Sequence, residues 1–133
     1  MFAVSAKLDY GLILLRELAM QYPRRRVSLR NVSVKHHLPY RYLAQIAVPL
    51  KKAGVVKSYE GVKGGYTLAR SPRHITLQEL SAILSGYKRA EHCQLDGHGV
   101  CKREEGCSIA TWWSRFDERF QSLLKKTTLA DLI

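Results

Sequence analysis

The spacing of apolar side chains near the start of the chain predicts a helix. Apolar positions recur every three or four residues between Ser5 and Gln21, which is the period of an amphipathic α-helix. Ser5 is a suitable N-cap, and Pro23 ends the helical pattern. The positions expected to face inward are Leu8, Leu12, Leu15, Ala19 and Tyr22.

Two short helices are expected next. Ser28 caps the first, which ends near His37, and Pro39 suits the first position of the second. Pro49 should kink the second helix or tighten its last turn, and Gly54 provides a C-terminal stop. The apolar face of this second helix comprises Leu43, Ile46 and Leu50, flanked by Ala47 and Ala53.

The apolar period then changes from 3.6 to 2, which is typical of strands. Val55–Tyr59 and Tyr66–Ala69 are expected to form a β-hairpin around the glycine-rich turn 60–65. After it, Thr76 and Glu79 have the spacing of a capping box. They predict another helix, which ends at Gly86.

A long C-terminal helix is expected from about Ser108 to Lys126. Its apolar stripe comprises Ile109, Trp112, Trp113, Phe116, Phe120, Leu123 and Leu124. An exposed stripe of this size usually marks an interface, and the alternative is that it packs only within its own chain. We therefore expect a DNA-binding domain over residues 1–86, a cysteine-bearing loop over 87–107, and a dimerisation helix with its tail over 108–133.

Two short helices joined by a tight break and followed by a hairpin are typical of a winged helix-turn-helix. The predicted fold is thus mainly α with a small β-hairpin, which forms the wing. The second short helix would enter the DNA major groove, where arginine can read guanine and glutamine can read adenine. The candidate DNA-binding residues are Ser28, Tyr40, Arg41, Ala44, Gln45, Lys51, Lys63 and Gly64. The alternative is a helix pair and hairpin used only for packing.

The distribution of charge favours DNA as the partner. The chain has 22 Lys and Arg against 11 Asp and Glu, a net charge of +11. Residues 93–133 hold six of each sign, so the whole excess lies in residues 1–92. Residues 24–63 alone hold ten basic side chains and one acid, Glu60. This pattern predicts a polyanionic partner that contacts the first part of the chain, and the alternative is a generally basic surface.

Three cysteines lie close together at positions 93, 101 and 107. Their spacing differs from the paired C-x2-C pattern of zinc sites. Thiolates are standard ligands of iron–sulfur clusters, and Lys102 and Arg103 would favour the thiolate state. A cluster would also need a fourth ligand, for which His92, His98, Glu91 and Asp96 are nearby candidates. The alternative is three ordinary thiols.

The chain resembles the IscR/NsrR-type, or Rrf-two, family of bacterial transcription regulators over essentially its whole length. The resemblance rests most on two stretches taken together, Leu50-Lys-Lys-Ala-Gly54 and Lys63-Gly-Gly-Tyr66. Further matches are Asp9-Tyr10, Tyr42-Leu-Ala-Gln45, Ile75-Thr-Leu77, the three cysteines and Thr128-Leu-Ala-Asp-Leu132.

The resemblance implies a homodimer formed through the C-terminal helix and a cluster that senses redox state, nitric oxide or cluster supply. It implies Cys93, Cys101 and Cys107 as cluster ligands. Ala110 stands where one branch of the family has a ligating histidine, and Asp9 stands where another branch has a carboxylate ligand from the partner subunit. We favour a [4Fe-4S] cluster, with a [2Fe-2S] cluster as the nearest variant. For Asp9 the alternative is a carboxylate that merely suits a helix N-terminus.

Other function classes are less well supported by the sequence. No catalytic triad, Walker loop or paired carboxylate site is visible, so we expect no enzyme. Neither a secretory signal nor a membrane span is evident, so we expect a cytoplasmic protein without membrane contact. The main alternative function is a cluster-free regulator whose thiols sense oxidants directly.

Overall fold

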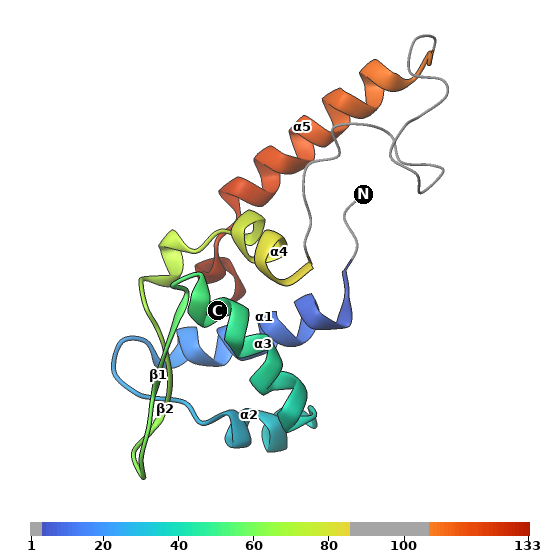
Figure 1. Cartoon of the computed structure of the whole chain (residues 1–133). Coiled ribbons are helices and arrows are strands. Elements are labelled where there is room, and N and C mark those ends of the chain that lie inside the picture. Colours follow the sequence, from blue (N-terminus) through green and yellow to red (C-terminus); the bar gives the residue numbers. More distant parts are fainter. Residues whose placement is uncertain (1–3, 86–106) are drawn as a thin grey trace.

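The computed structural model describes residues 4–85 and 107–133. The described part is mainly helical with one antiparallel β-hairpin (Figure 1). Its α-helices are α1 (Ala6–Gln21), α2 (Leu29–His36), α3 (Tyr40–Lys52), α4 (Leu77–Ser85) and α5 (Ala110–Lys126). The strands are β1 (Val56–Tyr59) and β2 (Gly65–Leu68), and two 3-10 helices are η1 (Pro72–His74) and η2 (Leu129–Leu132).

Side-chain caps set the starts of the first two helices, as the sequence predicts. The Ser5 hydroxyl accepts a hydrogen bond from the Leu8 N–H at 3.2 Å, and the Ser28 hydroxyl accepts one from the Arg30 N–H at 3.2 Å. Each bond satisfies a backbone donor that the first helical turn leaves without a partner. The beginnings of α1 and α2 are therefore fixed by local sequence.

The turn between α2 and α3 is sharp. His37 adopts a left-handed conformation with φ of 54°, so α2 ends there. Pro39, which the sequence places at the first helical position, is instead the N-cap, so α3 begins one residue later, at Tyr40. At the other end, Gly54 has φ of +72°, the left-handed conformation that commonly follows a helix. α3 is thus a short helix with a defined start and stop.

α1 is the central element of the core and packs against α3, α4, β2 and η2. Buried side chains come from nearly every described element, and the fully buried ones lie mainly on α1, α3 and α4. The largest are Leu8, Leu14, Leu15, Leu18, Leu43, Ile46, Leu50, Ile75, Leu80 and Leu129. Figure 1 shows the β1–β2 hairpin projecting at one end of the molecule and α5 extending away from the opposite end. The two projecting elements therefore lie far apart on a common helical body.

Several predicted boundaries need correction. β1 begins one residue later than expected and ends at Tyr59 as predicted, whereas β2 begins and ends one residue earlier than expected. The Ala69 N–H still donates to the Val55 carbonyl at 2.9 Å, just outside the assigned strands. α5 begins at Ala110 instead of near Ser108. The predicted end of α4, Gly86, lies outside the described residues. The 3-10 helix η2 was not predicted at all, and its Leu129 is buried against the core.

The expected capping box at α4 forms only in part. The Thr76 hydroxyl accepts a hydrogen bond from the Glu79 N–H at 3.2 Å, as predicted. The Glu79 carboxylate, however, binds the guanidinium of Arg70. A complete capping box is found instead at η2, between Thr128 and Asp131.

Candidate nucleic-acid interface

The outward face of α3 carries the best candidates for base contacts. Leu43, Ile46 and Leu50 point into the core and are fully buried. With 3.6 residues per turn, the opposite side of the helix is occupied by Arg41, Gln45, Val48 and Lys52, all of which are exposed. The sequence predicts Arg41 and Gln45 on this face, whereas Val48 and Lys52 were not among its candidates.

The other α3 candidates lie on the flanks of this face. Tyr40 and Lys51 are exposed at the first and last turns. Ala44 is half-buried and packs against the core, so only part of its methyl group is accessible. α3 can therefore present Tyr40, Arg41, Gln45 and Lys51 to a ligand more fully than Ala44.

Ser28 lies at the start of α2. Its hydroxyl oxygen already accepts the capping bond, yet its own hydrogen can still be donated to a phosphate oxygen. The Arg30 N–H that it caps belongs to the first turn of the helix, where backbone donors favour anions. Ser28 can thus act as both a cap and a phosphate donor.

The hairpin that forms the wing is braced along β2, near its turn. The register pairs Val56 with Leu68 and Tyr59 with Gly65. In addition, Val27 exchanges two backbone hydrogen bonds with Tyr66, at 2.8 and 2.9 Å. The segment before α2 thereby adds a third line of pairing to the hairpin and links the wing to the helix pair.

Arg26 supports the wing further and was missed as an individual residue by the sequence analysis. Its guanidinium donates to the carbonyl of Lys63 at 3.1 Å and lies 3.8 Å from the ring centroid of Tyr59. The first contact holds the backbone of the wing turn, and the second is a cation–π interaction. The Lys63 side chain remains exposed at the turn.

Gly64 is required by the wing turn itself. A Cβ atom at this position would lie 2.5 Å from the carbonyl oxygen of Tyr59 and 2.8 Å from that of Gly61. Neither backbone oxygen could yield without reshaping the turn. The glycine therefore determines the shape of the wing, whether or not DNA approaches it.

The ten basic side chains between residues 24 and 63 are all exposed, and so is the one acid, Glu60. Two of them are engaged within the protein. Arg26 holds the wing, and Lys35 donates to the Glu17 carboxylate at 2.9 and 3.0 Å. The remaining eight give the helix pair and wing a strongly positive surface, which suits a phosphate backbone.

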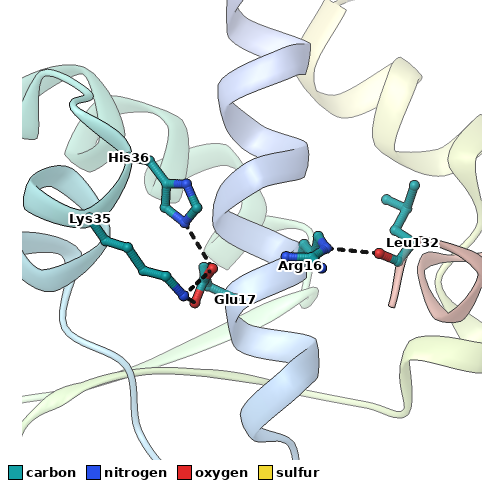
Figure 2. A network of polar contacts seen from close by, with 5 residues as sticks. All are labelled: Arg16, Glu17, Lys35, His36 and Leu132. Atoms are coloured by element: carbon teal, nitrogen blue, oxygen red, sulfur yellow. Dashed lines mark hydrogen bonds and ion pairs between the residues drawn. The ribbon is translucent and has the colours of Figure 1, made fainter.

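Glu17 ties α1 to α2. It is 7% exposed, and its carboxylate also contacts His36 Nε2 at 2.8 Å (Figure 2). Burial by itself would raise the pKa of Glu17, but the hydrogen bonds and positive charges of Lys35 and His36 outweigh it and leave the pKa below its usual value. The adjacent Arg16 points the other way, and its Nε donates to the carbonyl of Leu132 at 2.9 Å. α1 thus connects the helix pair to the C-terminal tail.

The proposed cluster ligands are only partly within the described residues. Cys93 and Cys101 lie outside them, as do His92, His98, Glu91 and Asp96. Cys107 is a half-buried free thiol just before α5. Asp9 is exposed in the first turn of α1. Within residues 4–85 and 107–133, no three His, Cys, Asp or Glu side chains come together as a metal site.

α5 leaves most of its apolar stripe uncovered. Leu124 is 3% exposed, whereas Trp112 is 55% exposed, and Ile109, Trp113, Phe116 and Leu123 are also exposed. The rings of Trp112, Trp113 and Phe116 contact each other, with centroids 4.7 to 6.0 Å apart.

No helix within the described residues is long and apolar enough to cross a membrane.

Comparison with known proteins identifies close relatives. The chain is 33% identical over 129 residues to the HTH-type transcriptional regulator CymR of Bacillus subtilis, covering 97% of this chain and 88% of CymR. The structure of CymR, the global cysteine regulator of B. subtilis, matches with a TM-score of 0.80 over 99% of this chain and 96% of that one.

Two other solved structures are similar. T. potens IscR has a TM-score of 0.74 and 29% identity, covering 98% of this chain and 85% of its own. The oxidized form of Staphylococcus aureus CymR has a TM-score of 0.72 and 26% identity, covering 96% and 93%. The Rrf2 family, described as iron-dependent transcriptional regulators, matches residues 4–133. The chain therefore belongs to the Rrf2 family of transcriptional regulators and has the winged-helix fold of that family.

Proposed function

We propose that this chain is a homodimeric transcription regulator that binds double-stranded DNA and whose operator affinity depends on an iron–sulfur cluster. The observation that carries the DNA-binding part is the outward face of α3 beside the braced wing. Arg41 and Gln45 supply hydrogen-bonding groups for base edges, and Lys63 supplies a charge for phosphate. Six further cations of residues 24–63, none engaged within the protein, provide affinity that does not depend on sequence.

The DNA-binding proposal is tested by selecting preferred sites from a random duplex library and then comparing two variants. Arg41→Ala should weaken binding to the selected site by about 1–3 kcal/mol and relax the preference at one position. Lys63→Ala should weaken binding to all duplexes alike and lower the salt slope by about one. Unchanged affinity in both variants would contradict this docking of α3 and the wing.

The uncovered stripe of α5 supports the homodimer part of the proposal. Three aromatic rings that contact each other form an apolar patch that water would otherwise cover. Aromatic side chains are typical of the buried centre of interfaces. Pairing this stripe with the same stripe of a second chain would give a twofold arrangement with two recognition helices, as paired DNA half-sites require.

Cys93, Cys101 and Cys107, with Asp9 of the second chain, are the ligands we propose for a [4Fe-4S] cluster. Three thiols and a carboxylate provide four donors, and thiolates are the standard ligands of such clusters. Asp9 is exposed, as a ligand offered to a second chain must be. A bound cluster would supply a centre sensitive to redox state and nitric oxide. Asp9 and Glu17 both lie on α1, and Glu17 holds α2 against it. Loss of a cluster bound at Asp9 would therefore shift α1 and, with it, the α2–α3 helix pair.

A cluster-free thiol sensor is the second candidate. It is favoured by the similarity to CymR, which is named a global cysteine regulator, and to the structure of an oxidized form of CymR. In this version oxidation of the clustered thiols would change operator affinity directly. Both candidates share the same DNA interface and differ in what the cysteines hold.

Anaerobic purification with iron and sulfide quantification separates these candidates. A [4Fe-4S] protein should show a broad visible absorbance band that Cys107→Ser abolishes or strongly reduces, because serine replaces a soft thiolate with a hard oxygen. Asp9→Ala should keep iron binding but shorten the lifetime of the cluster. Protein without iron whose affinity changes on oxidation, and recovers with reductant, would support the thiol sensor instead.

A further inference from the structure

Val48 is an apolar side chain on the outward face of α3. It is 51% exposed and lies seven residues after Arg41, so two helical turns place both on the same side. Lys52 follows four residues later on this side. Val48 therefore interrupts a row of polar and charged groups on the side of α3 that faces away from the core.

Exposure alone does not single out a valine, because isolated apolar side chains are normal on protein surfaces. The position of Val48 in the helix is more informative. Recognition helices of the homeodomain class read bases from positions i, i+3, i+4 and i+7. In α3 this spacing selects Arg41, Ala44, Gln45 and Val48. With Arg41 as the first residue of this set, Val48 is the last.

The geometry also allows Arg41 and Val48 to act together. Seven residues of α-helix span about 10 Å, which compares with about 12 Å for the width of the major groove. Both side chains can therefore reach base edges in one groove.

We infer, on the basis of the DNA-binding function proposed above, that Val48 contacts the C5-methyl group of a thymine and selects an A·T pair at that position. Valine has no hydrogen-bonding side-chain atoms, and the thymine methyl is the apolar group that bases present in the major groove. Against a G·C pair, the same side chain would cover donors and acceptors without satisfying them, which is costly. The half-buried Ala44 beside it adds a second, smaller apolar contact.

The test uses the full chain and the duplex it selects from a random library. Each thymine of that duplex is replaced in turn by deoxyuridine, which lacks only the methyl group. The wild-type protein should lose about fourfold in affinity at one thymine, which corresponds to the ~0.8 kcal/mol of one buried methylene-sized group. Val48→Ala, which removes most of the apolar contact, should clearly reduce this difference between the thymine and uracil duplexes at that position.

Two control variants make the result specific. Lys52→Ala, at the end of the same face, should weaken both duplexes equally and keep the fourfold difference. Val34→Ala removes another exposed valine, on α2, and should also keep it. If no thymine shows an effect that depends on Val48, or if the selected site contains no thymine, the inference about Val48 is wrong. Failure to select any sequence would overturn the DNA-binding proposal as well, and the two failures are thereby distinguished.

Discussion

At the scale of single residues, Glu17 illustrates how one buried charge can position a functional element. Its carboxylate receives hydrogen bonds from Lys35 and is in contact with His36, so α2 is held against α1 at its last turn. Removing one member of such a cluster leaves the other buried polar groups without their hydrogen-bond partners, which is costly. The same contact removes Lys35 from the cations available to DNA.

Replacing Glu17 by Gln should therefore lower the free energy of unfolding by about 1–2 kcal/mol at neutral pH, because Lys35 is partly exposed and its contribution is screened. The pKa of Glu17 is lowered from 4.5 in the folded protein. Its contribution to stability is thus present above the unfolded pKa and is lost as the pH falls through the folded pKa.

Denaturant unfolding between pH 3 and pH 7 measures this effect. The difference between wild type and Glu17→Gln should shrink as the acid range is reached. Glu60→Gln, an exposed carboxylate on the wing, is the matched control and should follow the wild type within about 0.5 kcal/mol. A constant difference between wild type and Glu17→Gln at every pH would mean that the pKa of Glu17 is not lowered.

At the scale of elements, local signals predict most of the fold. Ser5, Ser28 and Gly54 mark helix ends because each acts on backbone groups within a few residues. The hairpin follows from a change in apolar period and a glycine-rich turn. These features need no knowledge of the rest of the chain.

Elements that depend on distant contacts could not be predicted in the same way. The ion pair with Arg70 takes the Glu79 carboxylate out of the expected capping box. The 3-10 helix η2 is held by two distant contacts: the Leu129 N–H donates to the Ile75 carbonyl, and Arg16 donates to the Leu132 carbonyl. Ala44 has the sequence position of a base-reading residue, yet packing makes it half-buried. Val48 was overlooked for a different reason, since the predicted base-facing residues were taken from the start of the helix. Its spacing from Arg41 was the available signal.

At the scale of the whole molecule, charge and apolar surface are separated. The excess of positive charge lies in residues 1–92, and the charges of residues 93–133 balance. The exposed apolar stripe belongs to α5, which extends away from the end where the wing projects (Figure 1). Such a division lets one end bind a polyanion while the other end associates with a second chain.

The α5 stripe leads to the last prediction. Phe116→Asp should dissociate the proposed homodimer, because a charge would be buried at the centre of the aromatic patch formed with Trp112 and Trp113. Removing a central aromatic anchor costs 2 kcal/mol or more, so the dimer dissociation constant should rise at least about 30-fold. Circular dichroism should stay unchanged, since Phe116 is exposed within a single chain.

Sedimentation equilibrium of the full chain measures the change. Ser122→Asp introduces the same charge on the opposite side of α5 and should leave the dimer intact. The Phe116→Asp monomer should also lose affinity for a selected site with two half-sites far more than for a single half-site, because two linked recognition helices bind as one unit. If the Phe116→Asp protein remains dimeric, the dimer interface lies elsewhere. If the wild-type protein is monomeric, α5 does not contribute to operator recognition through dimerisation.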